Sequence, residues 1–296
     1  MTAIAMRTAL LMAALIALLG IGGWAFGGAH GLAVMIAVGL AINVGAYWFS
    51  DRIALLAHRA RPVSHDEAPE LYAIVGGLAA RAGMPMLSIH LIPSASPNAF
   101  ATGRGPGHAA VAVTEGLLQI VDRRELTGVL AHELSHVRNR DVLVATIAAG
   151  IAGVISTLGY VVQWGLLFGG AGGSEDRRDS PLVAVAWVIV APILALLLQL
   201  AISRAREYGA DASGARLTDD PDGLADALER LEIATQRRPY ALAGPATAHL
   251  FIVNPLRGRS ILSWLSTHPP IEDRVARLRA MSRRLERSGP LGDRLN

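Results

Sequence analysis

Four long runs of uncharged residues stand out in the pattern of hydrophobic and polar positions along the chain. They cover residues 8–29, 31–50, 142–174 and 180–203. A helix of roughly 20 apolar residues crosses the hydrocarbon core of a bilayer, and runs of this length are rare in soluble domains of this size. The pattern therefore predicts four transmembrane helices, arranged as one hairpin over residues 8–50 and a second over residues 142–203.

A cleaved signal peptide is the alternative interpretation of the first run, because Arg7 precedes a long apolar stretch. The run is longer than the apolar core of a typical signal peptide, however, and a second run follows it at once. We therefore expect the first run to be retained as a membrane-spanning helix.

The distribution of arginines predicts the orientation of these helices. Arginines lie beside the runs at Arg7, Arg52, Arg59, Arg61, Arg138, Arg140, Arg204 and Arg206. The turn near His30 has no Lys or Arg. Because cytoplasmic loops carry an excess of Lys and Arg, both termini and the segments 51–141 and 204–296 are expected in the cytoplasm. Arg177 and Arg178, in the loop between the last two runs, are the one feature against this orientation.

Shorter apolar patterns in these two segments predict an α+β fold. Helical spacing and strand-like alternation both occur there. The predicted helices cover residues 67–82, 223–234 and 270–285, and the predicted strands cover residues 87–92 and 109–113. Since both segments are expected on the same side of the membrane, 51–141 and 204–296 are predicted to form the first and second parts of one cytoplasmic domain.

The composition is typical of a membrane protein with a modest soluble part. Hydrophobic residues make up 52% of the chain and charged residues only 17%, which is less charge than soluble domains carry. The net charge is only +3, and no basic stripe is interleaved with aromatic residues, so nucleic acid is not an expected partner. The absence of cysteine excludes disulfides and thiolate metal sites.

His132, Glu133 and His136 form the pattern His-Glu-x-x-His within a predicted helix, which Asp122 could cap together with Glu125 in a capping box. Positions four apart lie on one side of a helix, so both histidines can reach one zinc ion while Glu133 addresses a water molecule at the metal. The pattern is a signature of metalloproteases. A pair of surface histidines near a helix end is the alternative, and the apolar face of this helix argues against it.

A catalytic zinc site needs a third protein ligand, and without cysteine the candidates are His, Asp and Glu. Glu207 and Asp211 directly follow the fourth run and are spaced to share a helix face. Glu207 could bind the zinc, and Asp211 could accept a hydrogen bond from a ligand histidine and so fix its tautomer. An ordinary helix beside the membrane, with solvated charges, is the alternative.

Five stretches of the chain carry a resemblance to a known family. They are Asn-Ala-Phe-Ala-Thr-Gly at 98–103, Val-Ala-Val-Thr-Glu-Gly-Leu-Leu at 111–118, the His-Glu-x-x-His motif, the stretch 203–211, and Ser-Thr-His-Pro-Pro at 266–270. Together they resemble the HtpX group of membrane-bound zinc metalloproteases in peptidase family M48, which are relatives of the Ste24 CAAX-processing proteases. The stretches occur in the order of that family and are interleaved with four spans, so the resemblance covers nearly the whole chain.

This resemblance implies a zincin-like (gluzincin) catalytic domain with a small β-sheet. His132, His136 and Glu207 would be the ligands of one Zn²⁺ per chain, and Glu133 would be the general base. His268 would face the active site and, with Arg274, steady the oxyanion. The alternatives are a helix-start turn before two prolines for His268 and a solvated charge for Arg274.

The resemblance also implies where a substrate strand is held. The segment concerned consists of Asn98, Ala99, Phe100 and Ala101. A peptide that lies beside it as an added strand would bind mainly through its backbone.

The implied activity is that of a zinc metalloendopeptidase in the bacterial cytoplasmic (inner) membrane. Its expected partners are the lipid bilayer and unfolded or damaged membrane proteins, which it would cut in quality control, and it could also cleave itself. A processing protease of narrower specificity, of the Ste24 kind, is one alternative, and four spans rather than a larger helical chamber argue against it. A non-catalytic membrane scaffold with a structural zinc is the other, and Glu133 argues against it because a structural site needs no base.

Overall fold

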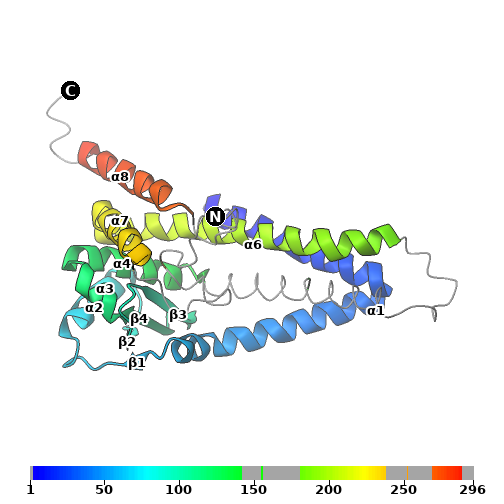
Figure 1. The fold of residues 1–296 in the computed structure, drawn as a ribbon, viewed down its shortest axis with the longest axis horizontal. Coiled ribbons are helices and arrows are strands. Elements are labelled where there is room, and N and C mark those ends of the chain that lie inside the picture. The colour runs from blue at the N-terminus through cyan, green and yellow to red at the C-terminus, as the bar shows by residue number, and fades with distance from the viewer. Residues whose placement is uncertain (1–2, 142–154, 156–180, 238–251, 253–268, 289–296) are drawn as a thin grey trace. The chain divides into compact units, whose positions relative to one another are not determined.

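The computed structural model of the protein describes residues 3–141, 155, 181–237, 252 and 269–288 (Figure 1). Its helices are α1 (Ala3–Ala57), α2 (Pro69–Ala82), α3 (Glu115–Ile120), α4 (Arg123–Arg138), α6 (Pro181–Thr218), α7 (Pro221–Arg237) and α8 (Ile271–Ser288). Its strands are β1 (Arg61–Pro62), β2 (Ser88–Ile92), β3 (Ala99–Gly105) and β4 (His108–Thr114). The chain divides into two compact units, Met1–Trp48 with Val144–Ala205, and Phe49–Leu143 with Arg206–Asn296.

In the first unit, α1 consists of two helices that meet at Gly28, where φ is 55° and ψ is −142°. Glycine adopts this left-handed conformation without the steric cost that a side chain would bring. A second glycine lets the two helices approach, because a Cβ atom on Gly23 would lie only 3.0 Å from the Cα atom of Leu32. The predicted runs 8–29 and 31–50 are thus both helical, with a break close to the expected turn.

The membrane spans themselves are not confirmed. Within the ranges that the structure describes, no helix is both long enough and apolar enough to cross a bilayer. The third predicted run, 142–174, lies outside the described residues apart from Ile155.

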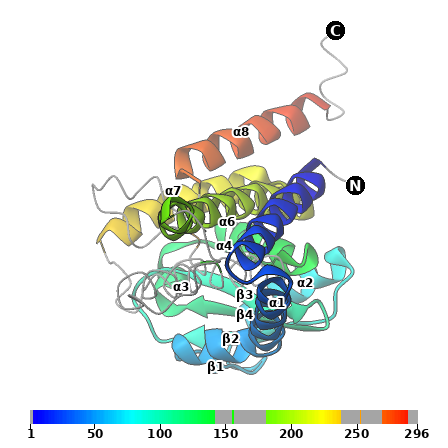
Figure 2. The same cartoon turned by 90° about the vertical axis from the view of Figure 1, so that its right-hand side faces the viewer.

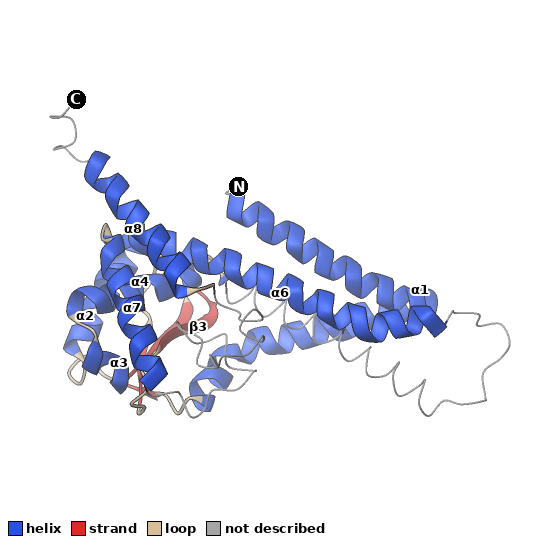
Figure 3. Cartoon of the chain, turned by 45° about the horizontal axis from the view of Figure 1, so that its top comes forward, coloured by secondary structure: helices blue, strands red, loops and turns tan. Residues whose placement is uncertain are grey.

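The second unit contains a four-stranded sheet with the order β1-β2-β4-β3. β2 and β4 are parallel, whereas β1 and β3 each pair antiparallel with their neighbour. β3 forms one edge of the sheet, with Ala101 opposite Val111 of β4. Figure 3 shows helices gathered around this small sheet, and the predicted α+β class with a small β-sheet is confirmed.

The local sequence explains where several of these elements end. The predicted helix 67–82 is α2, and Gly83 caps it in a left-handed conformation with φ of 67°. The N–H of Gly83 donates to carbonyl groups of the last turn, which is a common helix C-cap. β2 and β4 match the predicted strands, whereas β1, β3 and α3 were not predicted from the apolar pattern.

Helix α4 lies at the centre of the second unit. It packs on β3 and is covered by α7, and α8 packs on α7 in turn (Figure 2). Val129, Leu130 and Leu134 of α4 are fully buried, and each such side chain stabilises the fold by roughly 1.5–3 kcal/mol. This packing fixes the helix that carries the His-Glu-x-x-His motif against the sheet edge.

Candidate active site

The helix that carries the motif begins with the predicted capping box. The carboxylate of Asp122 accepts a hydrogen bond from the N–H of Glu125 at 2.8 Å, and the Glu125 carboxylate accepts one from the N–H of Asp122 at 2.8 Å. These two bonds satisfy N–H groups that a helix start otherwise leaves unpaired. The capping box therefore fixes where the helix begins. Within the helix, His132 and His136 are four residues apart and lie on the same side.

His132, His136 and Glu207 converge, and one ligand atom of each lies within 4.8 Å of the others. The Nε2 atoms of the two histidines are 3.2 Å apart. Glu207, on α6, places Oε2 3.7 Å from Nε2 of His132 and Oε1 3.5 Å from Nε2 of His136. All three side chains are at least largely buried, so the site is shielded from bulk water.

These distances fit a tetrahedral metal site. Ligand bonds of about 2.0–2.2 Å to zinc place neighbouring donor atoms roughly 3.3–3.6 Å apart. Two imidazole nitrogens and one carboxylate are also the donor set of catalytic zinc sites that keep a fourth position open. The chemistry and the spacing of the three donors therefore fit Zn²⁺.

A carboxylate fixes the tautomer of each histidine. Nδ1 of His132 donates to Oδ1 of Asp211 at 2.9 Å, and Nδ1 of His136 donates to Oδ2 of Asp141 at 2.8 Å. With the proton held on Nδ1, each Nε2 presents a lone pair toward the other. Two lone pairs at 3.2 Å repel unless a cation or a proton lies between them, so the arrangement is built to bind a cation.

Asp141 was not predicted from the sequence. It lies just after the end of α4. The residue before it, Arg140, takes a left-handed conformation with φ of 57°, which is unusual for a residue with a side chain. The turn brings Asp141 back to the end of the helix, where it is 8% exposed. Its spacing from His136 follows no general rule, so only the folded turn reveals the contact.

Arg274, on α8, is completely buried beside these residues. Its Nε donates to Oδ2 of Asp211 at 2.9 Å and its Nη2 donates to Oδ1 at 2.7 Å. Its Nη1 donates to the carbonyl oxygen of Ile252 at 3.0 Å and lies 3.4 Å from Oε2 of Glu207. The guanidinium thus donates to both oxygens of Asp211, the carboxylate that accepts a hydrogen bond from His132. His268, the other expected oxyanion residue, lies outside the described residues.

Glu133 is held next to the metal-binding group by the edge strand. Its Oε2 accepts a hydrogen bond from the N–H of Ala101 at 2.9 Å. Because this N–H is used by Glu133, it points away from β4 and toward the open edge of the sheet. Glu133 is only 6% exposed, and burial raises the pKa of its carboxyl group.

The segment expected to hold a substrate strand is buried. Asn98, Ala99, Phe100 and Ala101 are between 0% and 6% exposed. Oδ1 of Asn98 accepts from the N–H of Ile252 at 3.2 Å, and Phe100 stacks at a tilt on His58 with ring centroids 5.1 Å apart. These side chains therefore serve the packing of the fold.

Charge pairing shifts two pKa values beside the ligands. Burial alone would raise the pKa of Asp211, but the charge of Arg274 and the hydrogen bond from His132 bring it down to about 2. Burial alone would lower the pKa of His136, but the hydrogen bond to Asp141 and the charge of Glu207 raise it to about 9. Asp211 is therefore an anion at neutral pH, and His136 holds a proton in the metal-free protein.

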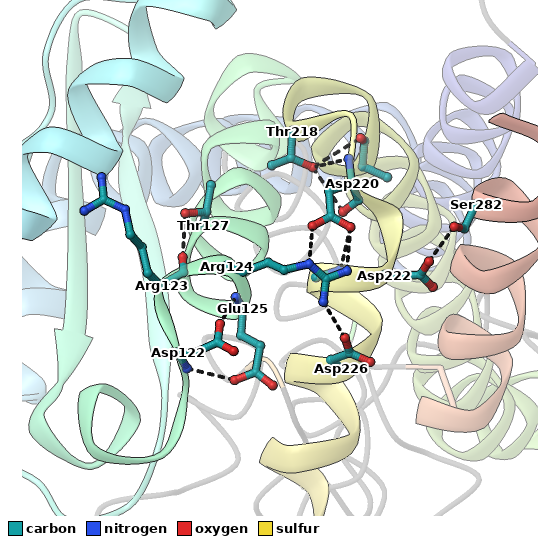
Figure 4. Close-up of polar contacts among 12 residues, drawn as sticks. Asp122, Arg123, Arg124, Glu125, Thr127, Thr218, Asp220, Asp222, Asp226 and Ser282 are labelled. Carbon is teal, nitrogen blue, oxygen red and sulfur yellow. Dashed lines mark hydrogen bonds and ion pairs between the residues drawn. The ribbon is translucent and has the colours of Figure 1, made fainter. Parts of the chain in front are cut away.

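Ion pairs join α4 to α7, and α7 in turn to α8. Figure 4 shows Arg124 between Asp220 and Asp226, at 2.6 Å from each. Arg279 of α8 lies 2.7 Å from Asp222 and 2.5 Å from Asp226. These side chains are partly exposed, so solvent screens each pair, and their shared contribution is to hold three helices in register.

Comparison with known proteins finds similar chains and one similar fold. A model of peptidase family M48 matches residues 65–282. A "Protease HtpX homolog" of Syntrophobacter fumaroxidans is 53% identical over 93% of this chain and 98% of its own length. A protein of the same name from Thermococcus kodakarensis is 50% identical over 94% of this chain and 96% of its own. The crystal structure of S. mikatae Ste24p has a similar fold, with a TM-score of 0.54 and 19% identity over 93% of this chain and 65% of Ste24p.

Proposed function

Because the chain belongs to peptidase family M48 and is a metalloendopeptidase, we propose that its metal is zinc, held by His132, His136 and Glu207. One observation carries this proposal. Three buried donor atoms converge at 3.2–3.7 Å, and both histidines have the Nδ1 proton fixed by a carboxylate, so that Nε2 is free to bind the metal.

A bound zinc ion would activate the attacking water and polarise the scissile carbonyl. Glu133 would take the proton from that water and return it to the leaving amine, as general base and then general acid. The N–H of Ala101 fixes the Glu133 carboxylate through one oxygen, Oε2. The same strand edge would also hold the peptide. Strand β3 would therefore position both the general base and the substrate.

Arg274 and Asp211 would act by positioning rather than by touching the substrate. Arg274 is completely buried and grips both oxygens of Asp211. Asp211 in turn orients His132. The role of His268 at the oxyanion stays a prediction from the resemblance.

We propose that the substrates are unfolded or damaged membrane proteins, cut at the cytoplasmic surface of a bacterial inner membrane. The resemblance to the HtpX group favours this role over a processing role of the Ste24 kind. The chain spans 98% of the Syntrophobacter relative but only 65% of Ste24p. A substrate beside β3 would meet backbone rather than side chains, and backbone recognition tolerates many sequences.

The test is proteolysis of an unfolded protein by the purified full chain in detergent or in lipid vesicles. We expect cleavage with zinc, none after chelation, and none by Glu133→Gln, which should keep its zinc. Glu286→Gln, an exposed glutamate on α8, is the matched control and should cleave like the wild type. Cleavage by a zinc-loaded Glu133→Gln variant would refute the role of Glu133.

Proximity to the bilayer needs its own assay. One unfolded segment is presented either tethered to a membrane helix or free in solution, at matched concentration in vesicles. We expect the tethered segment to be cut faster, and equal rates would contradict selection of substrates at the membrane.

A further inference from the structure

Helices α6 and α4 touch backbone to backbone at Gly214. A Cβ atom built on Gly214 would lie 2.9 Å from the N atom of His132, 3.1 Å from its Cα atom and 3.1 Å from the carbonyl carbon of Ala131. Side chains essentially never approach backbone atoms below 3.0 Å. Only a glycine therefore allows α6 to lie this close to the residue that carries the first ligand.

The same face of α6 carries the other half of the metal site. Glu207, Asp211 and Gly214 are spaced four and then three residues apart, which places them on one side of a helix. The contact at Gly214 is thus one turn beyond the carboxylate that meets His132 at 2.9 Å. The distance between α6 and α4 therefore determines the distance from the carboxylates of Glu207 and Asp211 to the two histidines.

We propose that Gly214 is a positioning residue of the metal site, which sets the distance from Glu207 and Asp211 to the two histidines. The inference rests on the proposed zinc site. An alanine at Gly214 would have to push α6 away by several tenths of an ångström to reach an ordinary contact distance. Metal–ligand distances tolerate only about ±0.2 Å, so such a shift is large enough to weaken zinc binding.

A second glycine on α4 separates this role from packing in general. A Cβ atom on Gly128 would lie 2.6 Å from the N atom of Leu224 and 2.9 Å from the carbonyl carbon of Gly223. This crowding is more severe than that at Gly214, but it faces α7, which carries none of the proposed ligands. Gly77 on α2 has no atom within 4 Å of a built Cβ and serves as the uncrowded control.

The experiment compares Gly214→Ala, Gly128→Ala and Gly77→Ala in the full chain. Zinc affinity is measured by competition with a chromophoric chelator, and thermal unfolding is measured on the metal-free protein. We expect Gly214→Ala to lose zinc affinity about 10–100-fold, the cost typical of disturbed ligand support. Gly128→Ala should unfold at a lower temperature but keep wild-type zinc affinity, and Gly77→Ala should keep both.

A longer carboxylate supplies a rescue. In the Gly214→Ala background, Asp211→Glu adds one methylene and should recover part of the lost affinity, whereas the same change in the wild type should lower it. Wild-type affinity in Gly214→Ala would overturn the inference, as would equal losses in Gly214→Ala and Gly128→Ala. So would a Gly214→Ala chain that fails to fold where Gly128→Ala folds. Failure of the zinc site itself would show differently, as a wild type that binds no zinc.

Discussion

Replacing Asp141 by asparagine tests the part of the site that the sequence did not predict. Oδ2 of Asp141 accepts a hydrogen bond from Nδ1 of His136 at 2.8 Å, and Asp141 is buried. The amide keeps the size of the side chain and can still accept a hydrogen bond, but it removes the negative charge. Loss of such a supporting carboxylate typically lowers metal affinity by about 10–100-fold, which corresponds to roughly 1.4–2.7 kcal/mol.

Protonation of His136 makes this loss depend on pH. With the pKa of His136 at about 9 in the metal-free wild type, a proton competes with zinc at pH 7 and lowers the apparent affinity by roughly 100-fold. Asp141→Asn lowers this pKa, because the carboxylate is one of the groups that raise it. At pH 7 a proton on His136 therefore competes with zinc less in the variant than in the wild type. The difference in zinc affinity between the variant and the wild type should grow as the pH rises to 9.

Isothermal titration of zinc in buffers with different ionisation enthalpies measures both quantities. We expect the wild type to release about one proton from His136 per zinc at pH 7, and Asp141→Asn to release fewer. Asp66→Asn is the matched control, since Asp66 lies 3.6 Å from His65 in a fully exposed pair. Wild-type affinity and wild-type proton release in Asp141→Asn, at both pH values, would refute the reasoning.

Three further predictions follow from the same geometry. Glu207→Ala should lose far more zinc than Asp211→Ala, because the first removes a ligand and the second a support; a wild-type zinc content in Glu207→Ala would remove Glu207 from the ligand set. Arg274→Met should lower the free energy of unfolding by about 3–5 kcal/mol in urea titrations, since it removes the buried positive charge that pairs with Asp211; an unchanged midpoint would contradict this pairing. The metal-free protein should lose stability as the pH rises from 6.5 to about 9, because the pKa of His136 is raised on folding and its bound proton stabilises the folded state only below that value; urea midpoints that do not fall over this range would disagree.

The described helices other than α3, and two of the strands, could be predicted because their signals are local. The capping box of Asp122 and Glu125 lies within four residues, and it fixes the register of the motif helix. Glu207 and Asp211 could be placed on one helix face by spacing alone. The position of Glu207 and Asp211 beside His132 depends on how α6 packs on α4. No local sequence pattern predicts this packing.

The contacts that complete the site could not be predicted, because each joins residues that are far apart or lie in an unusual backbone conformation. Arg274 reaches Asp211 across 63 positions of sequence. Asp141 reaches His136 through the left-handed turn at Arg140. The burial of Asn98 also has a distant cause, since its side chain accepts from the N–H of Ile252.

X-ray absorption at the zinc edge of the purified protein tests directly whether two histidines and one glutamate hold a catalytic zinc ion. We expect one zinc per chain, bound by two imidazole nitrogens and by oxygen ligands at about 2.0–2.2 Å, with the histidine contribution to the signal reduced in His132→Ala. A metal-free protein after zinc loading, or an unchanged histidine signal in His132→Ala, would contradict it.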